Sequence, residues 1–347
     1  MNLDKYICTV PFTNVEIHKN EYFSCCPSWL NYKLDSKKIE LKDLWNSKEL
    51  DEIRDSMLDG SFKFCDKTQC PFLSKLVNHN VVSGPIIVKT KQNVERLSNL
   101  DGPETILMNF DRTCNYKCPS CRIDLIVENK SGIKRVEHTI EEIDKYLSKN
   151  VKNIYITGSG DPFVSVGFRN YLRNFDSSKY ASLSNIHLHT NASMWNKEMW
   201  DSMLNVHKYV KSCEISIDAG TKDTYENKTR LGGNWDNLIN NLKFIATIPT
   251  LKNIKTSFVV QESNYQEMET FADLMFDIFG KKVNVFFGKI NNWGTFLDEE
   301  FKEKQVWSTH HIEHNKFISE FNKIWHKPYV FHNMHEFSLN KKSKNII

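Results

Sequence analysis

The chain has 347 residues, of which 40% are hydrophobic and 26% are charged, and its formal net charge is +3. These values are typical of a globular protein that folds as one large domain, or as a large and a small domain. A net charge this close to zero gives no support for a nucleic-acid-binding or membrane-binding protein.

No apolar run approaches the length of a membrane span, and the N-terminal stretch Met1-Asn2-Leu3-Asp4-Lys5 is not typical of a signal peptide. We therefore expect a cytoplasmic protein without membrane contact. In a reducing compartment, clustered thiols are more often metal ligands than disulfides. The nine cysteines of the chain are therefore candidate metal ligands.

Residues 1–80 are expected to form a small module. Residues 15–23 alternate around a polar turn at Lys19-Asn20, which predicts a β-hairpin. Residues 41–58 show helical spacing, and Gly60 can end that helix. Five cysteines lie in this segment, and two pairs of them could together form a four-thiolate metal site: Cys8, Cys25, Cys26, Cys65 and Cys70. A structural zinc site is the alternative, although Cys65 and Cys70 are spaced unlike a zinc ribbon.

Residues 81–101 carry few large apolar residues, and we interpret them as a linker to the next domain. A short apolar run, 106–110, then precedes Cys114, Cys118 and Cys121. Thiolate is a soft ligand that suits iron-sulfur clusters and zinc. Three ligands leave one metal position open, as a catalytic site requires. The alternative is a structural zinc site that takes its fourth ligand from elsewhere.

Residues 104–290 alternate between strand and helix patterns, which predicts a parallel sheet with right-handed crossovers. One helix is expected to start at a capping box, Thr139-Ile140-Glu141-Glu142. Another is expected to start at Asn264 with Glu267 as its reciprocal cap, and to end at Gly280. The strands are predicted at 106–110, 153–157, 185–189, 212–217, 254–260 and 283–287.

Polar residues follow these strands, at the ends where barrel enzymes carry their chemistry. Gly158-Ser159-Gly160-Asp161 offers backbone N–H groups and a carboxylate that suit a charged amine, or it is an ordinary turn. Ser216 and Asp218 alternate onto one face and can hold ribose hydroxyls. The guanidinium of Arg230 can bind a carboxylate. Considered without the other residues, Arg230 would be interpreted as part of a surface ion pair.

The C-terminal residues 296–347 are expected to be a helical extension. Trp293, just before it, is expected to pack. His310 and His314 would share a helical face without an acidic or thiol partner, which favours a solvated helix over a metal site. The tail at Lys341-Lys342-Ser343-Lys344 is expected to be frayed.

The three-cysteine stretch resembles the signature of the radical SAM enzymes, although Ser120 stands where the family usually has an aromatic residue. The resemblance implies an α/β fold, a partial (β/α)6 TIM-type barrel over residues 102–295. It implies a 4Fe-4S cluster held by Cys114, Cys118 and Cys121, whose open iron binds S-adenosylmethionine (SAM). The SAM-binding residues it implies are Ser159, Gly160, Asp161, Asn191, Ser216, Asp218, Arg230 and Gln261.

The order of cysteines, turn and helix in residues 1–80 resembles the SPASM and twitch modules of radical SAM enzymes. This resemblance implies a second, auxiliary 4Fe-4S cluster, and only four ligands are evident, which favours a twitch-like module. The ligands it implies are Cys8, Cys25, Cys65 and Cys70, with Cys26 left out.

The implied activity is reductive cleavage of SAM to a 5′-deoxyadenosyl radical, which abstracts a hydrogen from a substrate. The implied partner is a one-electron donor of the flavodoxin or ferredoxin type. We favour a peptide or protein side chain as substrate, with a sugar-like small metabolite as the alternative. A non-catalytic metal-binding scaffold is a different class, and the three-ligand loop argues against it. A nucleic-acid-modifying enzyme gains no support from the net charge.

Overall fold

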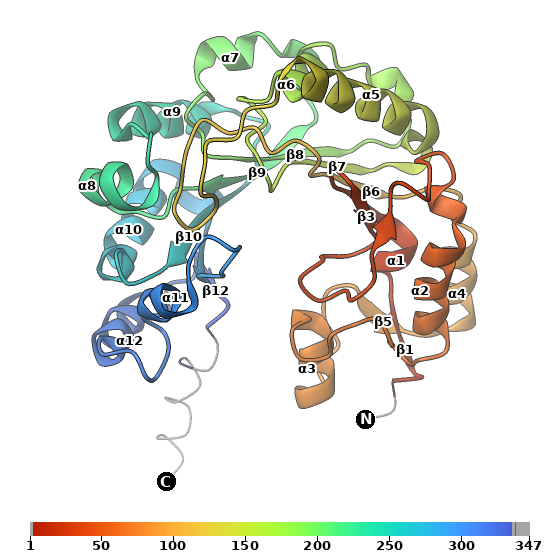
Figure 1. Cartoon of the computed structure of the whole chain (residues 1–347), viewed down its shortest axis with the longest axis horizontal. Helices are drawn as coiled ribbons and strands as arrows, with labels where there is room; N and C mark the ends of the chain where they lie inside the picture. The colour runs from red at the N-terminus through yellow and green to blue at the C-terminus, as the bar shows by residue number, and fades with distance from the viewer. Residues whose placement is uncertain (1–2, 335–336, 338–347) are drawn as a thin grey trace. The chain divides into compact units, whose positions relative to one another are not determined.

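The computed structural model describes residues 3–334 and 337, and Figure 1 shows the course of the chain. Residues of the chain group into two compact units. The first unit comprises residues 1–111, 128–159 and 170–186. The second comprises residues 112–127, 160–169 and 187–347. The predicted tail at 341–344 lies outside the described residues.

The predicted hairpin forms in the first unit. Strand β2 (Asn14–Ile17) pairs antiparallel with β3 (Glu21–Phe23), and β4 (Leu34–Asp35) adds to β3. On its other side β2 pairs in parallel with β6 (Thr105–Met108), which pairs in parallel with β7 (Asn153–Ile156). The hairpin is therefore part of the same sheet as the first two strands of the strand-helix repeat.

The expected linker 81–101 contains regular structure. Strand β5 (Ile86–Val88) pairs antiparallel with β1 (Tyr6–Cys8), and the buried Leu97 lies in a helix that follows β5. The helices of the first unit are α1 (Val10–Thr13), α2 (Lys48–Leu58), α3 (Pro71–His79), α4 (Lys91–Ser98) and α5 (Lys130–Tyr146).

Helix α5 starts ten residues earlier than predicted, counted from N-cap to N-cap. Its N-cap is Asn129, whose side chain accepts a hydrogen bond from the Gly132 backbone N–H. Thr139 lies inside the helix, where its hydroxyl donates to the Arg135 carbonyl at 2.9 Å. The prediction of a capping box at Thr139 is therefore wrong. The short polar side chain of Asn129 is an equally good cap, and the apolar face continues upstream to Val136.

Parallel strands form the sheet of the second unit, in the order β8, β9, β10, β11 and β12. Their bounds are β8 (Asn185–Thr190), β9 (Val210–Ser216), β10 (Asn253–Val260), β11 (Val283–Lys289) and β12 (Val330–His332). The helices that alternate with them are α6 (Val166–Arg173), α7 (Lys197–Asp201), α8 (Lys222–Thr224), α9 (Trp235–Thr247), α10 (Met268–Phe279), α11 (Asp298–Lys304) and α12 (His314–Ile324). The C-terminal segment thus adds a strand, β12, beside its helices. The α/β class that the sequence predicts is confirmed.

Helix α10 covers one face of this sheet. Phe271 of α10 packs against Phe258 of β10 and Phe287 of β11, with ring centroids 5.0 and 6.0 Å apart. All three side chains are fully buried, and each such burial stabilises the fold by about 1.5–3 kcal/mol. Gly280 ends the helix at a positive φ, as predicted. No helix among the described residues is long and apolar enough to span a bilayer.

The predicted cap of α10 is wrong. Asn264 makes no capping bond; its amide oxygen accepts from the Gln261 N–H at 2.9 Å, and its amide nitrogen donates to the Asp218 carbonyl at 2.9 Å. The Glu267 carboxylate accepts from the backbone N–H groups of Gly220 and Thr221 at 2.7 and 3.1 Å. Both side chains therefore fix the loop that follows β9.

Candidate active site

The three cysteines of the signature lie on the loop that follows β6. Cys114 and Cys118 are buried, and Cys121 is exposed. The loop is held by backbone hydrogen bonds from Cys114 N–H to the Ile126 carbonyl and from Lys117 N–H to the Leu231 carbonyl, both 3.0 Å long. Two of the three thiols are therefore shielded, and the third lies at the surface.

A side-chain N–H group lies beside each of these thiols. Asn191 Nδ2 is 3.6 Å from Cys114 Sγ, and Arg230 Nη1 is 3.5 Å from Cys118 Sγ. Arg122 Nη2 is 3.4 Å from Cys121 Sγ. Within the described range, no three His, Cys, Asp or Glu side chains converge closely enough to hold a metal ion as they stand.

The residues present nevertheless fit a thiolate-bound cluster. Three soft sulfur donors lie on one loop, and two buried cations, Arg122 and Arg230, can balance the charge of ionised thiols. Burial raises the pKa of the Cys114 and Cys118 thiols, and the guanidinium groups of Arg122 and Arg230 act in the opposite direction. Binding a metal would displace the thiol protons.

The loop after β7 contains Ser159, Gly160 and Asp161. The Ser159 hydroxyl donates to the Asn109 carbonyl at 2.8 Å. The buried Asp161 carboxylate accepts from the Thr190 hydroxyl at 2.7 Å and from the Asn191 N–H at 2.8 Å. It also accepts from the backbone N–H groups of Phe163 and Val164 at 3.0 and 3.3 Å. Asp161 thus ties its own loop to the end of β8.

The loop after β9 positions Arg230 next to Asp218. Asp218 has a positive φ of 60° and accepts from the Val259 N–H at 2.7 Å. Arg230 Nη2 lies 2.7 Å from its carboxylate, and both side chains are buried. Burial opposes the charge on Arg230, but Asp218 and the Cys118 thiol outweigh it and raise the pKa of the guanidinium.

A π-helical turn, Tyr225–Thr229, delivers Arg230 to this position. Single π turns are often found at functional sites. The Tyr225 hydroxyl lies 3.1 Å from the Tyr116 hydroxyl, so the turn also contacts the cysteine loop. Gln261 is buried directly after β10. Asn191, Ser216, Asp218 and Arg230 thus gather at the ends of β8 and β9.

Cys8, Cys65 and Cys70 pack against one hydrophobic cluster of the first unit, and Cys25 acts electrostatically on Cys8 and Cys65. Burial raises the pKa of Cys25 to about 11 and of Cys65 to about 12. The negative charges that Cys25, Cys65 and Cys70 would carry as thiolates raise the pKa of the Cys8 thiol further. Cys65 also lies opposite Leu30 in a β-bridge, and Trp29 Nε1 donates to Cys25 Sγ at 3.2 Å.

The sequence interpretation missed a polar cluster on one face of β8, β9 and β10. His189 Nε2 lies 3.0 Å from Ser216 Oγ, and His187 Nδ1 lies 2.8 Å from Ser212 Oγ. Burial would raise the pKa of Glu214, but His189 and Lys255 outweigh it and lower that pKa to about 2. These residues occupy alternate positions along their strands, and this alternation is the sequence pattern from which the cluster could have been predicted.

The histidines of the C-terminal segment do not share a helical face. His310 and His311 lie in turns before α12, and His314 is the first residue of that helix. His311 Nε2 lies 3.0 Å from the Glu303 carbonyl, and the His314 ring packs near Phe317 and Phe337. The prediction of a solvated helix across these residues is therefore wrong.

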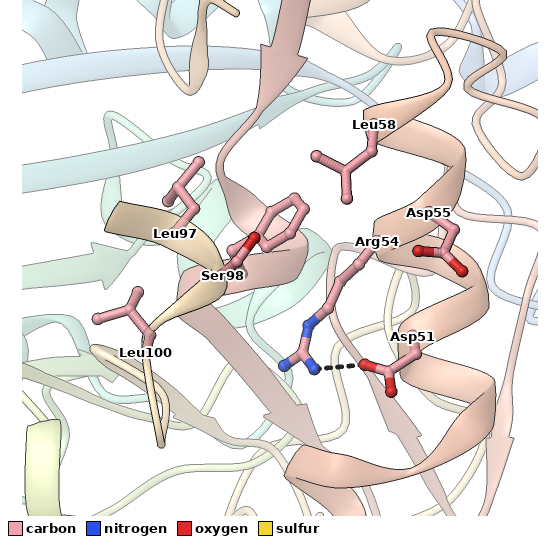
Figure 2. A pocket seen from close by; sticks show the side chains of 8 residues that line it. Asp51, Arg54, Asp55, Leu58, Leu97, Ser98 and Leu100 are labelled. Atoms are coloured by element: carbon pink, nitrogen blue, oxygen red, sulfur yellow. Dashed lines mark hydrogen bonds and ion pairs between the residues drawn. The ribbon is translucent and has the colours of Figure 1, made fainter. Parts of the chain in front are cut away.

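A cavity of about 160 Å³ lies in the first unit, and Figure 2 shows the side chains that line it. Arg54 points toward Asp51, 2.8 Å away, and its guanidinium lies over the Trp45 ring at 4.4 Å. The same guanidinium donates to the Pro11 and Trp45 carbonyls. Arg54 therefore serves to join α2 to the chain around it, and we assign no ligand to this cavity.

A comparison with family models identifies the class of protein. The Radical SAM superfamily model matches residues 108–275, which include the cysteine loop, Asp161, Asn191 and Arg230. Residues 108–275 therefore form a radical SAM domain, and the α/β fold is that of the partial barrel of this superfamily. The family implies a 4Fe-4S cluster and SAM as cofactors.

Solved structures are similar at low identity. The Streptococcus suis protein SuiB bound to the precursor peptide SuiA is 13% identical, with a TM-score of 0.46 over 84% of this chain and 64% of SuiB. The protein anSMEcpe with bound AdoMet and the Cp18Cys peptide is 15% identical, with a TM-score of 0.41 over 64% of this chain and 59% of that one. The chain thus spans less than two thirds of either protein. A comparison with curated proteins finds no match.

Proposed function

We propose that this radical SAM enzyme abstracts a hydrogen atom from a peptide or protein side chain. The proposal rests on one face of the sheet of the second unit, the face that α10 does not cover. When bound, the cluster and SAM supply a 5′-deoxyadenosyl radical, and the protein positions the substrate and shields the reaction. The composition of that face suits an extended, amphipathic substrate.

One half of this face is polar. Lys255 Nζ lies 3.0 Å from a Glu214 carboxylate oxygen, and Ser257 hydrogen-bonds the other oxygen. His187 and His189 continue the polar surface across β8, beside the hydroxyls of Ser212 and Ser216. Such a surface can pair with the amide groups of a peptide backbone.

The other half of the face is aromatic. Phe286 of β11 pairs in register with Phe331 of β12, and residues paired in this way lie on the same side of a sheet. Phe331 is 51% exposed, and Lys255 Nζ lies 4.3 Å from the Phe286 ring centroid. The hydroxyl-rich half alone would also suit a sugar-like metabolite, but the exposed Phe331 beside the half-buried Phe286 favours a peptide.

SAM is expected at the residues gathered beside the cysteine loop. Arg230 would receive the SAM carboxylate, Ser216 and Asp218 the ribose hydroxyls, and Ser159, Gly160 and Asp161 the amino group. We expect Asp161 to act largely by holding Asn191 in place, because four N–H or O–H donors already engage its carboxylate. Asn191 and Gln261 complete the proposed contacts.

A second 4Fe-4S cluster is proposed in the first unit. The mutual proximity of Cys8, Cys25, Cys65 and Cys70 supports it. The backbone supplies two points of attachment, because Cys65 pairs with Leu30 and Cys70 N–H donates to the Asp66 carbonyl at 3.0 Å. We propose Cys25 as the hairpin ligand, because its charge acts on both Cys8 and Cys65.

A one-electron donor of the flavodoxin or ferredoxin type would dock at the exposed edge of the cysteine loop. Cys121 is exposed there, and three apolar side chains that follow it are 56–63% exposed: Ile123, Leu125 and Val127. Exposed apolar side chains that cluster on one segment are typical of interaction surfaces.

The test is anaerobic reconstitution with iron, sulfide, SAM and dithionite, followed by mass spectrometry for 5′-deoxyadenosine. The wild-type enzyme should form 5′-deoxyadenosine, and the variant with Cys114, Cys118 and Cys121 all replaced by Ala should form none. Peptide and sugar libraries added to the wild-type reaction should separate the two substrate classes. A mass loss or new cross-link confined to sugars would overturn the peptide proposal.

A further inference from the structure

Arg122 follows Cys121 directly, and its side chain is 6% exposed. Its Nη1 donates to the Arg112 carbonyl at 2.9 Å, and its Nη2 lies 3.4 Å from Cys121 Sγ. The backbone N–H of Arg122 donates to the Cys118 carbonyl at 3.1 Å. The guanidinium thus makes two of these contacts, and the backbone N–H of the same residue makes the third.

A guanidinium in the protein interior needs negative charge nearby, because burial disfavours the charged form. The thiols of the cysteine loop would supply that charge when they are ionised as cluster ligands, and the Arg122 guanidinium lies directly beside one of them, Cys121. The two other N–H donors to these thiols, Asn191 and Arg230, are residues that we assign to SAM.

We propose that Arg122 raises the reduction potential of the cluster held by Cys114, Cys118 and Cys121. Reduction adds one negative charge to the cluster, and a fixed cation at a ligand sulfur stabilises that charge. Hydrogen bonds to the sulfurs and the net charge near a cluster are known to set its potential. This inference rests on the proposed ligand set, and it is independent of the substrate.

The test compares four reconstituted full-length proteins: wild type, Arg122→Met, Arg122→Lys and Lys117→Met. Lys117 is the matched control, because it lies on the same loop but its side chain is 54% exposed and therefore screened by solvent. Iron content is measured first. The midpoint potential is then measured by a redox titration that follows the EPR signal that changes on addition of SAM.

For Arg122→Met we expect the equilibrium constant for reduction to fall about tenfold, a shift of about 59 mV to more negative potential for one electron. Arg122→Lys keeps the charge but loses the planar group, so its potential should lie between those of Arg122→Met and wild type. Lys117→Met should match wild type.

An Arg122→Met protein with full iron and a wild-type potential would overturn the proposal. If Arg122→Met binds no iron, Arg122→Gln takes its place in the same titration, and full iron with a wild-type potential in that variant would equally contradict the proposal. Absence of any SAM-responsive cluster in the wild-type protein would instead show that the ligand assignment is wrong. The two failures are therefore distinguishable.

Discussion

Single side chains at the ends of β8 and β9 serve several neighbours at once. Arg230 donates to the Ile217 carbonyl and to Cys118 Sγ, and forms an ion pair with Asp218. These contacts with described residues occupy three of the five N–H groups of a guanidinium. Two N–H groups then suffice for a bidentate bond to a carboxylate, which makes Arg230 a suitable partner for SAM.

Replacing Arg230 by Ala should weaken SAM binding about ten- to a hundredfold, because a charge-assisted contact typically contributes about 1.5–3 kcal/mol. Titration of the reconstituted enzyme with SAM measures the effect. Lys228→Ala is the control, since Lys228 lies in the same π turn with its side chain 47% exposed. Equal affinity in the two variants would show that the SAM carboxylate binds elsewhere.

His187 should make the enzyme less stable in acid. Burial, the neighbouring His189 and Lys255 lower the pKa of His187 to about 4, and Glu214 acts in the opposite direction. An unfolded histidine has a pKa of about 6.5. Between these values the unfolded chain binds the extra proton, so stability is complete above pH 6.5 and falls toward pH 4.

Melting temperatures measured between pH 4 and 7 test this expectation. His187→Gln should flatten the profile relative to wild type, by an amount on the order of 1–2 kcal/mol for a half-buried group. His138→Gln should leave the profile unchanged, because that side chain is 70% exposed. A His187→Gln profile parallel to the wild-type one would mean that other groups set the acid limit.

At the scale of elements, short strands and loops bring the auxiliary thiols together. Cys8 ends β1, Cys25 follows β3, and Cys70 precedes α3. Cys8, Cys65 and Cys70 pack against an apolar cluster that includes Ile7, Met57 and Leu73. The packed cluster fixes the backbone, and we expect metal to fix the thiols.

The reconstituted enzyme should carry about eight irons if both clusters form. Replacing Cys114, Cys118 and Cys121 together should leave about four, with a spectrum that SAM does not change. Cys26→Ala should leave the iron content unchanged, whereas Cys25→Ala should lower it. Zinc in place of iron, or the reverse response of Cys25 and Cys26, would contradict the auxiliary assignment.

At the scale of the whole molecule, the chain divides its candidate sites between two compact units. The auxiliary thiols belong to the first unit, together with β6 and β7. The second unit contains the cysteine loop, Arg230 and the polar and aromatic sheet face. We propose that the second unit receives electrons from a partner, with the exposed edge of the cysteine loop as the point of entry.

Changing both Ile123 and Leu125 to Ser should slow cluster reduction by a flavodoxin about tenfold or more, because the docking surface loses its apolar side chains. Reduction by dithionite should be unchanged, since a small reductant needs no docking. Stopped-flow absorbance measures both rates. Val81→Ser with Val82→Ser is the control, as these residues are 47% and 44% exposed on the first unit. Equal slowing by the two reductants would indicate damage to the cluster instead.

The sequence by itself determined the features that depend on neighbouring residues. The alternation of strands and helices, the hairpin at Lys19-Asn20 and the end of α10 at Gly280 were predicted correctly. The C-x3-C-x2-C spacing pointed to the family whose model matches residues 108–275, because the three proposed ligands lie on a single short loop. Local periodicity and backbone preference act over a few residues, so they can be recognised in the linear chain.

Only the tertiary structure decided which distant residues meet. Glu267 was expected to cap its own helix, but it binds the N–H groups of Gly220 and Thr221, 47 and 46 residues away. Asp161 meets the end of β8, and β2 pairs with β6 across the expected linker. The Arg122 guanidinium donates to the Arg112 carbonyl, ten residues away, and this contact fixes it beside the Cys121 thiol. Such contacts form where burial leaves polar groups in need of partners, and no local pattern in a sequence records which partner is within reach.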